Sequence, residues 1–115
     1  MKKSDKNLVE DIIDHCTCII EESRPYESLE TALAQNRLFK AAMERWILNI
    51  GEACHKLNPS FKANHPTIPW NTIIGMRNIL AHDYDEVAEE IIANVIKIHL
   101  PRLRQYLTQI NLEDY

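Results

Sequence analysis

The chain has 115 residues and a mass of 13.4 kDa, which predicts one helical domain over residues 1–115 rather than two domains. Hydrophobic residues make up 45% of it and glycine occurs only twice, which argues against a turn-rich β-sandwich or barrel. With 13 Lys and Arg against 17 Asp and Glu, the net charge is −4, which excludes binding of long nucleic acid by bulk charge because phosphate neutralisation needs clustered cations.

The first two predicted helices follow from the spacing of apolar residues. Between Asp5 and Glu22, apolar residues recur at intervals of three and four, which predicts an amphipathic helix with Ser4 as its N-cap. The Arg24-Pro25 step ends this helix. A second helix is expected from Ser28 to Leu57, and it is the long central helix of the chain.

The next stretch is rich in proline. Pro59, Pro66 and Pro69 lie close together, so we expect a surface connection between the second helix and Pro69. Because proline suits the first turn of a helix, a third helix is expected to start near Pro69 and to continue to about Ala81.

A fourth helix is expected from about Asp85 to Leu107, with a kink near Pro101 because proline cannot donate to the helical hydrogen-bond ladder. Four helices with short connections predict an all-α fold, an antiparallel bundle of four to five helices. No apolar stretch approaches the roughly 18 residues of a membrane span, and the basic N-terminus lacks an apolar signal core. We therefore expect a cytoplasmic protein without a membrane partner.

The three cysteines indicate neither a disulfide framework nor a metal site. Cys16 and Cys18 are two residues apart, which separates them by about 200° on a helix. The chain contains no CxxC and no HExxH motif. We expect Cys16 and Cys54 to be small buried thiols, and no metal or cofactor is predicted.

One segment concentrates reactive side chains near the end of the third helix. It contains a cation, an amide, an imidazole and a phenol, at Arg77, Asn78, His82 and Tyr84. On a continuous helix Asn78 and His82 share a face, whereas Arg77 and His82 differ by about 140°. Arg77 and His82 therefore converge only if the helix loosens near Ala81 or if a second chain faces the first.

These residue types suit metal-independent cleavage of an RNA phosphodiester. The ribose 2′-hydroxyl must lose a proton and the leaving 5′-oxygen must gain one, and an imidazole such as that of His82 titrates in the range that serves either step. The forked guanidinium of Arg77 can hold the phosphate, and Asn78 can orient it. From spacing alone, structural pairing or solvent exposure of Arg77 and His82 stays open, and Tyr84 taken alone is typical of a residue at the edge of a core.

At these residues the sequence resembles a known family. Residues 77–84, read as RNxxxHxY, resemble the motif of HEPN-domain proteins, and specifically of HepT-like toxins from type VII HepT/MntA toxin–antitoxin modules. The resemblance covers most of the chain, because IGEACHKL at residues 50–57 and IPWNTIIGMRNILAHDYDEV at residues 68–87, which includes the motif, resemble two ordered blocks of that family.

The resemblance implies a helical homodimer in which the Arg and His of both chains line a shared cleft that acts as a metal-independent RNA endonuclease. This role transfers to Arg77 and His82, with Asn78 as the accompanying polar residue. It further implies a partner, an MntA-like nucleotidyltransferase antitoxin, that transfers AMP to Tyr84 and neutralises the toxin. Negative phosphates added there would repel RNA and occupy the arginine. Larger hetero-oligomers with the antitoxin are also possible on this reading.

Two residues of the central helix bear on Arg77. Glu52 is expected either to orient Arg77 through a charged hydrogen bond or to form an ordinary surface ion pair. Gly51 costs up to about 1 kcal/mol relative to alanine inside a helix, which indicates a close helix crossing at that position.

Affinity for RNA would depend on a few cations, which are Arg37, Lys40, Arg45 and Arg77. The alternative is that Arg37, Lys40 and Arg45 form only a solvated face of the second helix. Asp83 and Asp85 flank the motif and would repel phosphate if they pointed inward, which is not the favoured placement. The remaining histidines show no ligand spacing and are expected to be structural or exposed: His15, His55, His65 and His99.

Dimerisation has a rationale in the third helix. Its apolar residues surround more of the circumference than one core face requires, which predicts a second chain against it; they are Trp70, Ile73, Ile74, Ile79 and Leu80. Trp46 and Trp70 are expected to anchor a core or an interface.

The alternative to a ribonuclease is a non-catalytic nucleotide- or partner-binding subunit of a nucleotidyltransferase complex.

Overall fold

The computed structural model describes residues 4–82 and 89–110, and every regular element in them is helical. The elements are α1 (Asp5–Ser23), α2 (Leu29–Gln35), α3 (Arg37–Lys56), α4 (Pro59–Asn64), α5 (Trp70–His82), α6 (Glu89–Asn94), a π-helical segment η1 (Val95–His99) and α7 (Leu100–Thr108). The all-α prediction is confirmed.

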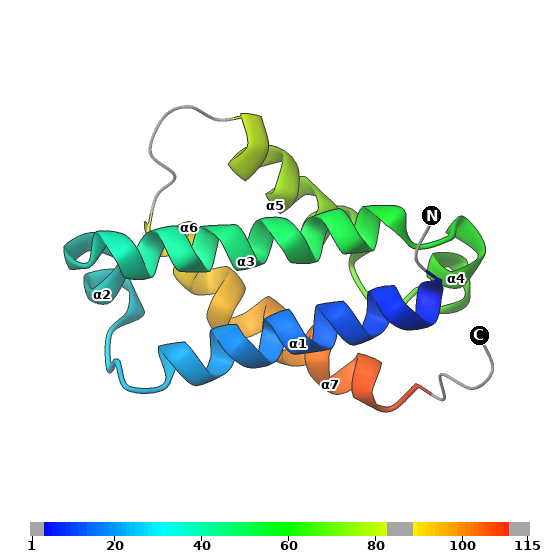
Figure 1. Cartoon of the computed structure of the whole chain (residues 1–115), viewed down its shortest axis with the longest axis horizontal. Coiled ribbons are helices and arrows are strands. Elements are labelled where there is room, and N and C mark those ends of the chain that lie inside the picture. Colours follow the sequence, from blue (N-terminus) through cyan, green and yellow to red (C-terminus); the bar gives the residue numbers. More distant parts are fainter. Residues whose placement is uncertain (1–3, 83–88, 111–115) are drawn as a thin grey trace.

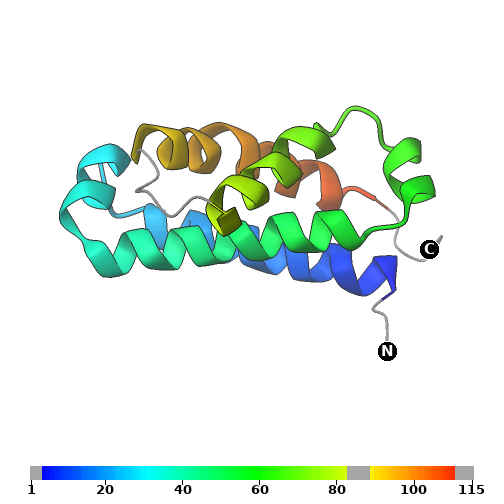
Figure 2. The same cartoon turned by 90° about the horizontal axis from the view of Figure 1, so that it is seen from above.

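The long helices run antiparallel to their neighbours (Figures 1 and 2). Helix α3 packs on α1 along one side and on α5 along the other, while α7 packs on α1 and α2 on α6. Helix α1 begins and α7 ends at the same end of the bundle, beside α4. The predicted antiparallel bundle is therefore present, with α3 as its central helix.

Helix α1 agrees with its prediction within one residue. The Ser4 hydroxyl accepts a hydrogen bond from the backbone N–H of Asn7 at 3.2 Å, as expected of an N-cap. The Asp5 carboxylate accepts from the backbone and side-chain nitrogens of Asn58 at 3.1 and 3.0 Å. This contact joins the start of α1 to the segment that links α3 and α4.

The expectation of one unbroken helix from Ser28 to Leu57 was wrong. Asn36 has an extended backbone, with φ −119° and ψ 99°, and it separates α2 from α3. Its side-chain oxygen accepts from the N–H of Phe39 at 3.0 Å, while its own N–H donates to the carbonyl of Ala32. Asn36 thus ends one helix and caps the next, which asparagine does well because its amide competes with the helical backbone.

The proline-rich connection contains a helix that was not predicted. Helix α4 starts with Pro59 at its first position, where the missing N–H costs nothing. Its Phe61 is buried, with 1% of its surface exposed. The indole N–H of Trp70 donates to the carbonyls of Lys62 and His65 at 3.2 and 3.0 Å, which fixes the start of α5 against the end of α4.

The C-terminal helical region is interrupted, as the kink expected near Pro101 implies. Residues 95–99 form a π-helical turn in which the N–H of Leu100 donates to the carbonyl of Val95, five residues earlier. Pro101 has no N–H, so the α-helical ladder cannot continue through it. Residues 85–88 of the predicted helix lie outside the described part of the chain.

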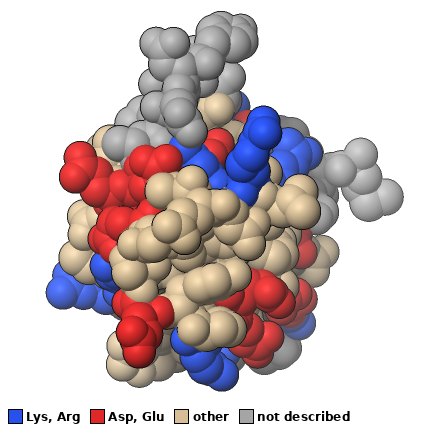
Figure 3. Space-filling view, turned by 90° about the vertical axis from the view of Figure 1, so that its left-hand side faces the viewer, with Lys and Arg blue, Asp and Glu red and all other residues tan. Residues whose placement is uncertain are grey.

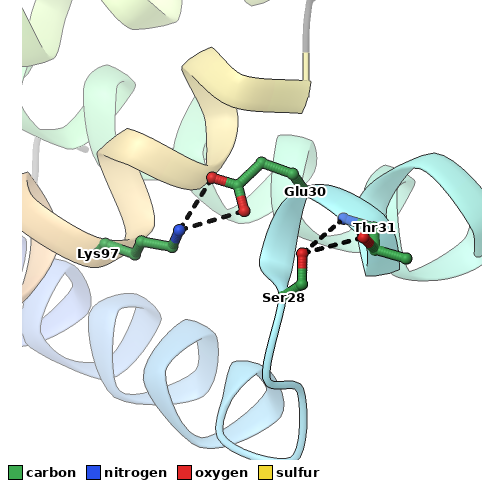
Figure 4. Close-up of polar contacts among 4 residues, drawn as sticks. All are labelled: Ser28, Glu30, Thr31 and Lys97. Carbon is green, nitrogen blue, oxygen red and sulfur yellow. Dashed lines mark hydrogen bonds and ion pairs between the residues drawn. The ribbon is translucent and has the colours of Figure 1, made fainter.

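A contact between distant segments holds η1 to α2. Figure 4 shows Lys97 of η1 reaching both carboxylate oxygens of Glu30, with Nζ–O distances of 2.9 and 3.2 Å. The neighbouring Ser28 caps α2 by accepting from the N–H of Thr31 at 3.2 Å. The capped end of α2 therefore presents Glu30 to the π-helical turn.

The core is formed by the inward faces of all the long helices. It contains both cysteines expected to be buried, and burial raises the pKa of Cys16 and of Cys54 to about 12. No disulfide joins the three cysteines, which are all free thiols. Among the helices described, none is long and apolar enough to cross a membrane.

The apolar residues of α5 are largely used within one chain. Trp70 and Ile73 are buried, and Ile74 and Leu80 pack partly against the same core. Trp70 and Ile73 therefore do not require a second chain, contrary to the expectation from the sequence, whereas Ile74 and Leu80 stay partly exposed in one chain. The side chain of Ile79 lies outside the description. Trp46 also packs against this core, as expected of an anchor.

Candidate active site

Helix α5 carries the residues of the reactive motif that lie in the described part of the chain. It is helical from Trp70 through His82, so the backbone does not loosen near Ala81. Asn78 and His82 share a face, and Arg77 lies about 140° from His82 around the axis. The side chain of His82 lies outside the description, as do the whole of Asp83, Tyr84 and Asp85.

The guanidinium of Arg77 is held from two sides. Its Nε donates to Glu52 Oε1 of α3 at 2.7 Å, and its Nη1 donates to Asn78 Oδ1 at 2.6 Å. The Arg77 side chain is 25% exposed and that of Glu52 is 36% exposed. These contacts use two of the five N–H donors of the guanidinium, and no other partner is seen among residues 4–82 and 89–110. The remaining donors can bind an anion.

The charge of Glu52 is stabilised by its surroundings. The hydrogen bond from Arg77 is the main cause of the lowered pKa of Glu52, and the positive charges of Arg77, Lys56 and His55 lower this pKa further. Burial of the carboxylate acts in the opposite direction. A lowered pKa means that the pair stabilises the fold above the ordinary carboxyl pKa and loses this effect as the pH falls through the lowered value. The contact therefore persists at neutral pH.

The influence of His55 and Lys56 on Glu52 was not predicted from the sequence, in which His55 was expected only to be structural or exposed. A signal was available, because residues three and four positions apart on a helix are neighbours. The Glu52 carboxylate contacts Arg77 directly across two helices, and its role in orienting Arg77 stays a prediction.

Gly51 lies where α3 and α5 approach each other closely. A Cβ atom added to Gly51 would overlap Cβ of Arg77 and would stand 3.1 Å from its Cγ and 3.2 Å from its Cα. The close helix crossing expected from this glycine is confirmed.

The predicted cations do not form one RNA-binding surface. Lys40 is buried, with 8% of its surface exposed, and its Nζ lies 3.2 Å from Glu89, so its expected place on a solvated face was wrong. Arg37 and Arg45 are exposed. Figure 3 shows that at this end of the molecule lysine and arginine side chains are separated by acidic and uncharged ones. The cations drawn at this end are therefore scattered and do not join into one basic surface.

No group of three or more His, Cys, Asp and Glu side chains in residues 4–82 and 89–110 is placed to hold a metal ion. The chemistry that the described site offers is that of a partly exposed, oriented guanidinium on the helix that also carries a histidine at its last position. Such an arginine binds phosphate through parallel hydrogen bonds.

Comparison with known proteins gives the family. The profile described as "Ribonuclease HepT-like" matches residues 11–110. "Probable ribonuclease HepT" of Thermococcus cleftensis is 33% identical over 104 residues, which cover 90% of this chain and 93% of that protein. A Caldanaerobacter subterraneus protein whose name proposes an RNase is 30% identical over 110 residues, covering 94% and 95% of the two chains.

A Methanocaldococcus jannaschii protein, also proposed by its name to be an RNase, is 27% identical over 104 residues, covering 90% of this chain and 94% of that protein. No solved structure matches the chain at a significant level. The family profile spans nearly the whole chain, from within α1 to the end of α7, and includes the helix crossing that holds Arg77. This chain belongs to the HepT-like ribonuclease family.

Proposed function

We propose that this protein is an RNA endonuclease that acts as the toxin of a toxin–antitoxin module. The observation that carries the proposal is the guanidinium of Arg77, which Glu52 and Asn78 hold in place while a quarter of the side chain stays exposed. The names of the relatives, which include a probable ribonuclease HepT, support the same activity. A preorganised cation is the group that a phosphoryl-transfer reaction needs most.

In the proposed reaction Arg77 binds the scissile phosphate and stabilises the charge that builds up on it. His82 acts as general acid or base, either removing the proton from the 2′-hydroxyl or giving one to the leaving 5′-oxygen. Asn78 is a positioning residue, because its side-chain oxygen accepts a hydrogen bond from Arg77.

The proposed cleft lies between two copies of the chain. Because α5 stays helical through His82, positions 77 and 82 of one chain lie about 140° apart around the helix axis. A second copy facing α5 would bring its own histidine toward the first arginine. The continuity of α5 supports this homodimer, whereas Trp70 and Ile73, which are buried within one chain, do not.

Neutralisation is proposed to occur at Tyr84. A partner nucleotidyltransferase would join the tyrosine oxygen to the α-phosphorus of ATP, with release of pyrophosphate. The added phosphate would lie two residues from His82 in sequence and would compete with RNA for the arginine.

The purified chain is expected to cut single-stranded RNA equally well in magnesium and in excess EDTA, because arginine and histidine supply the chemistry. The measurement is the initial cleavage rate on labelled RNA, with DNA of the same sequence as control, which lacks the 2′-hydroxyl and should stay intact. Cleavage only with metal would contradict the mechanism. RNA left uncut under both conditions would favour a nucleotide- or partner-binding subunit.

Incubation with the partner nucleotidyltransferase and ATP is expected to add AMP to the parent chain and none to Tyr84→Phe. Intact mass spectrometry measures this directly. Tyr26→Phe, at a tyrosine that is 38% exposed, is the matched control and should gain the same mass as the parent. An unchanged mass gain on Tyr84→Phe would move the acceptor to another residue.

A further inference from the structure

We infer that Gly51 is a positioning residue for Arg77: its missing side chain lets the Arg77 backbone approach α3 closely enough for the guanidinium to reach Glu52. The inference rests on the proposed function in so far as Arg77 binds the phosphate. It concerns a residue that does not itself contact RNA.

Gly51 contacts the stem of the Arg77 side chain. An added Cβ on Gly51 would overlap Cβ of Arg77 and crowd its Cα at 3.2 Å. Neither of these two atoms can be moved by a change of rotamer, because both are fixed by the backbone of α5. Any residue larger than glycine at position 51 therefore requires α5 to move away from α3.

The backbone conformation of α3 does not explain why position 51 is a glycine. No glycine of the described chain has a positive φ, so Gly51 is not needed for an unusual backbone conformation. It lies inside α3, where glycine is a poorer helix former than alanine. What the position requires is the absence of a Cβ atom.

Glu52, the next residue of α3, contacts the other end of the Arg77 side chain. Its Oε1 accepts from Arg77 Nε at 2.7 Å. Gly51 and Glu52 thus contact opposite ends of one side chain, the first at Cα and Cβ and the second at the guanidinium. If α5 moved outward, the stem of Arg77 would move with it, and Nε would leave the reach of Glu52.

The second glycine of the chain, Gly75, provides a matched control. It lies in α5, two residues before Arg77, and a Cβ added there would meet nothing within 4 Å. Alanine at position 75 improves helix propensity without a clash. The variants Gly51→Ala and Gly75→Ala therefore make the same chemical change with opposite consequences for the helix crossing.

The experiment compares these two variants by NMR and by kinetics. The Arg77 Nε–H resonance, assigned by its loss in Arg77→Lys, reports the hydrogen bond to Glu52. In Gly75→Ala this resonance and kcat should stay as in the parent. In Gly51→Ala the resonance should shift and exchange faster with solvent, and kcat should fall about 10- to 100-fold, since small misplacements of a reacting group have effects of this size.

A structural role alone would not predict the next result. Glu52→Gln should lower kcat in the parent but should have no further effect in Gly51→Ala, because the contact is already lost there. Unchanged Nε–H exchange and unchanged kcat in Gly51→Ala would overturn the inference. So would equal effects of Glu52→Gln in both backgrounds.

If Gly51→Ala does not fold, a second pair of variants tests whether the Cβ atom of Arg77 is what a side chain at position 51 would overlap. Arg77→Gly removes the clashing Cβ, whereas Arg77→Ala keeps it. Gly51→Ala should therefore lower the thermal midpoint less in the Arg77→Gly background than in the Arg77→Ala background, and equal losses would overturn the inference. The NMR and stability readouts need no RNA cleavage, so a parent chain without nuclease activity would refute the proposed function and leave this test intact.

Discussion

Replacement of His82 by alanine is expected to lower kcat for RNA cleavage by about 10²- to 10⁴-fold, the usual contribution of a general acid or base. His82 is the last residue of α5, where an alanine continues the helix without strain. The loss should therefore appear in the cleavage rate and not in the far-UV circular dichroism spectrum or in the oligomer mass.

His15→Ala is the matched control. His15 lies in α1, which packs on α3 and α7, and the variant should cleave RNA at the parental rate. If His82→Ala degrades RNA as fast as the parent, the histidine has no part in the chemistry, and the proposed mechanism is wrong.

Arg77→Lys is expected to reduce kcat by about 10²- to 10³-fold although the charge is kept. An ammonium group carries its three donors on one freely rotating nitrogen, so it cannot hold Glu52, Asn78 and a phosphate in the fixed planar geometry of the guanidinium. Single-turnover cleavage with saturating enzyme separates this loss from weaker binding.

Arg102→Lys is the control for the general effect of the exchange, because Arg102 is exposed on α7. It should leave kcat unchanged.

Coexpression of Arg77→Lys with His82→Ala adds a test of the shared cleft, since a mixed dimer would contain one site with both original residues. Parental rates in Arg77→Lys alone would show that the arginine does not stabilise the transition state.

The helix boundaries show how far periodicity leads. Helices α1 and α5 were predicted within one residue because a cap or a proline marks their starts. The break at Asn36 was missed because its neighbours continue the apolar pattern, while the extended backbone of Asn36 and its side-chain hydrogen bond from Phe39 mark the start of a new helix. Helix α4 was missed because Pro59 was interpreted only as a break, although proline is equally suited to a first helical turn.

Of the contacts at the candidate site, the pairing of Glu52 with Arg77 was expected from the sequence, whereas the overlap of Gly51 with the stem of Arg77 was not. Gly51 indicated a close crossing, yet the identity of the partner residue depends on the relative rotation of two helices, which the sequence does not encode locally. The same limitation applies to Lys40, whose aliphatic stem and charge are buried against Glu89 from the far end of the chain. Pairings over such sequence separations follow from the packing of the whole bundle.

The indole of Trp70 determines the direction in which α5 leaves α4, because its N–H is tied to two carbonyls at the end of that helix. From Trp70 to His82 a helix extends roughly 18 Å. A tilt of about 5° at the indole would displace the far end by roughly 1.6 Å, a shift comparable to those that impair catalysis. Alignment of the histidine thus depends on an anchor at the opposite end of its own helix.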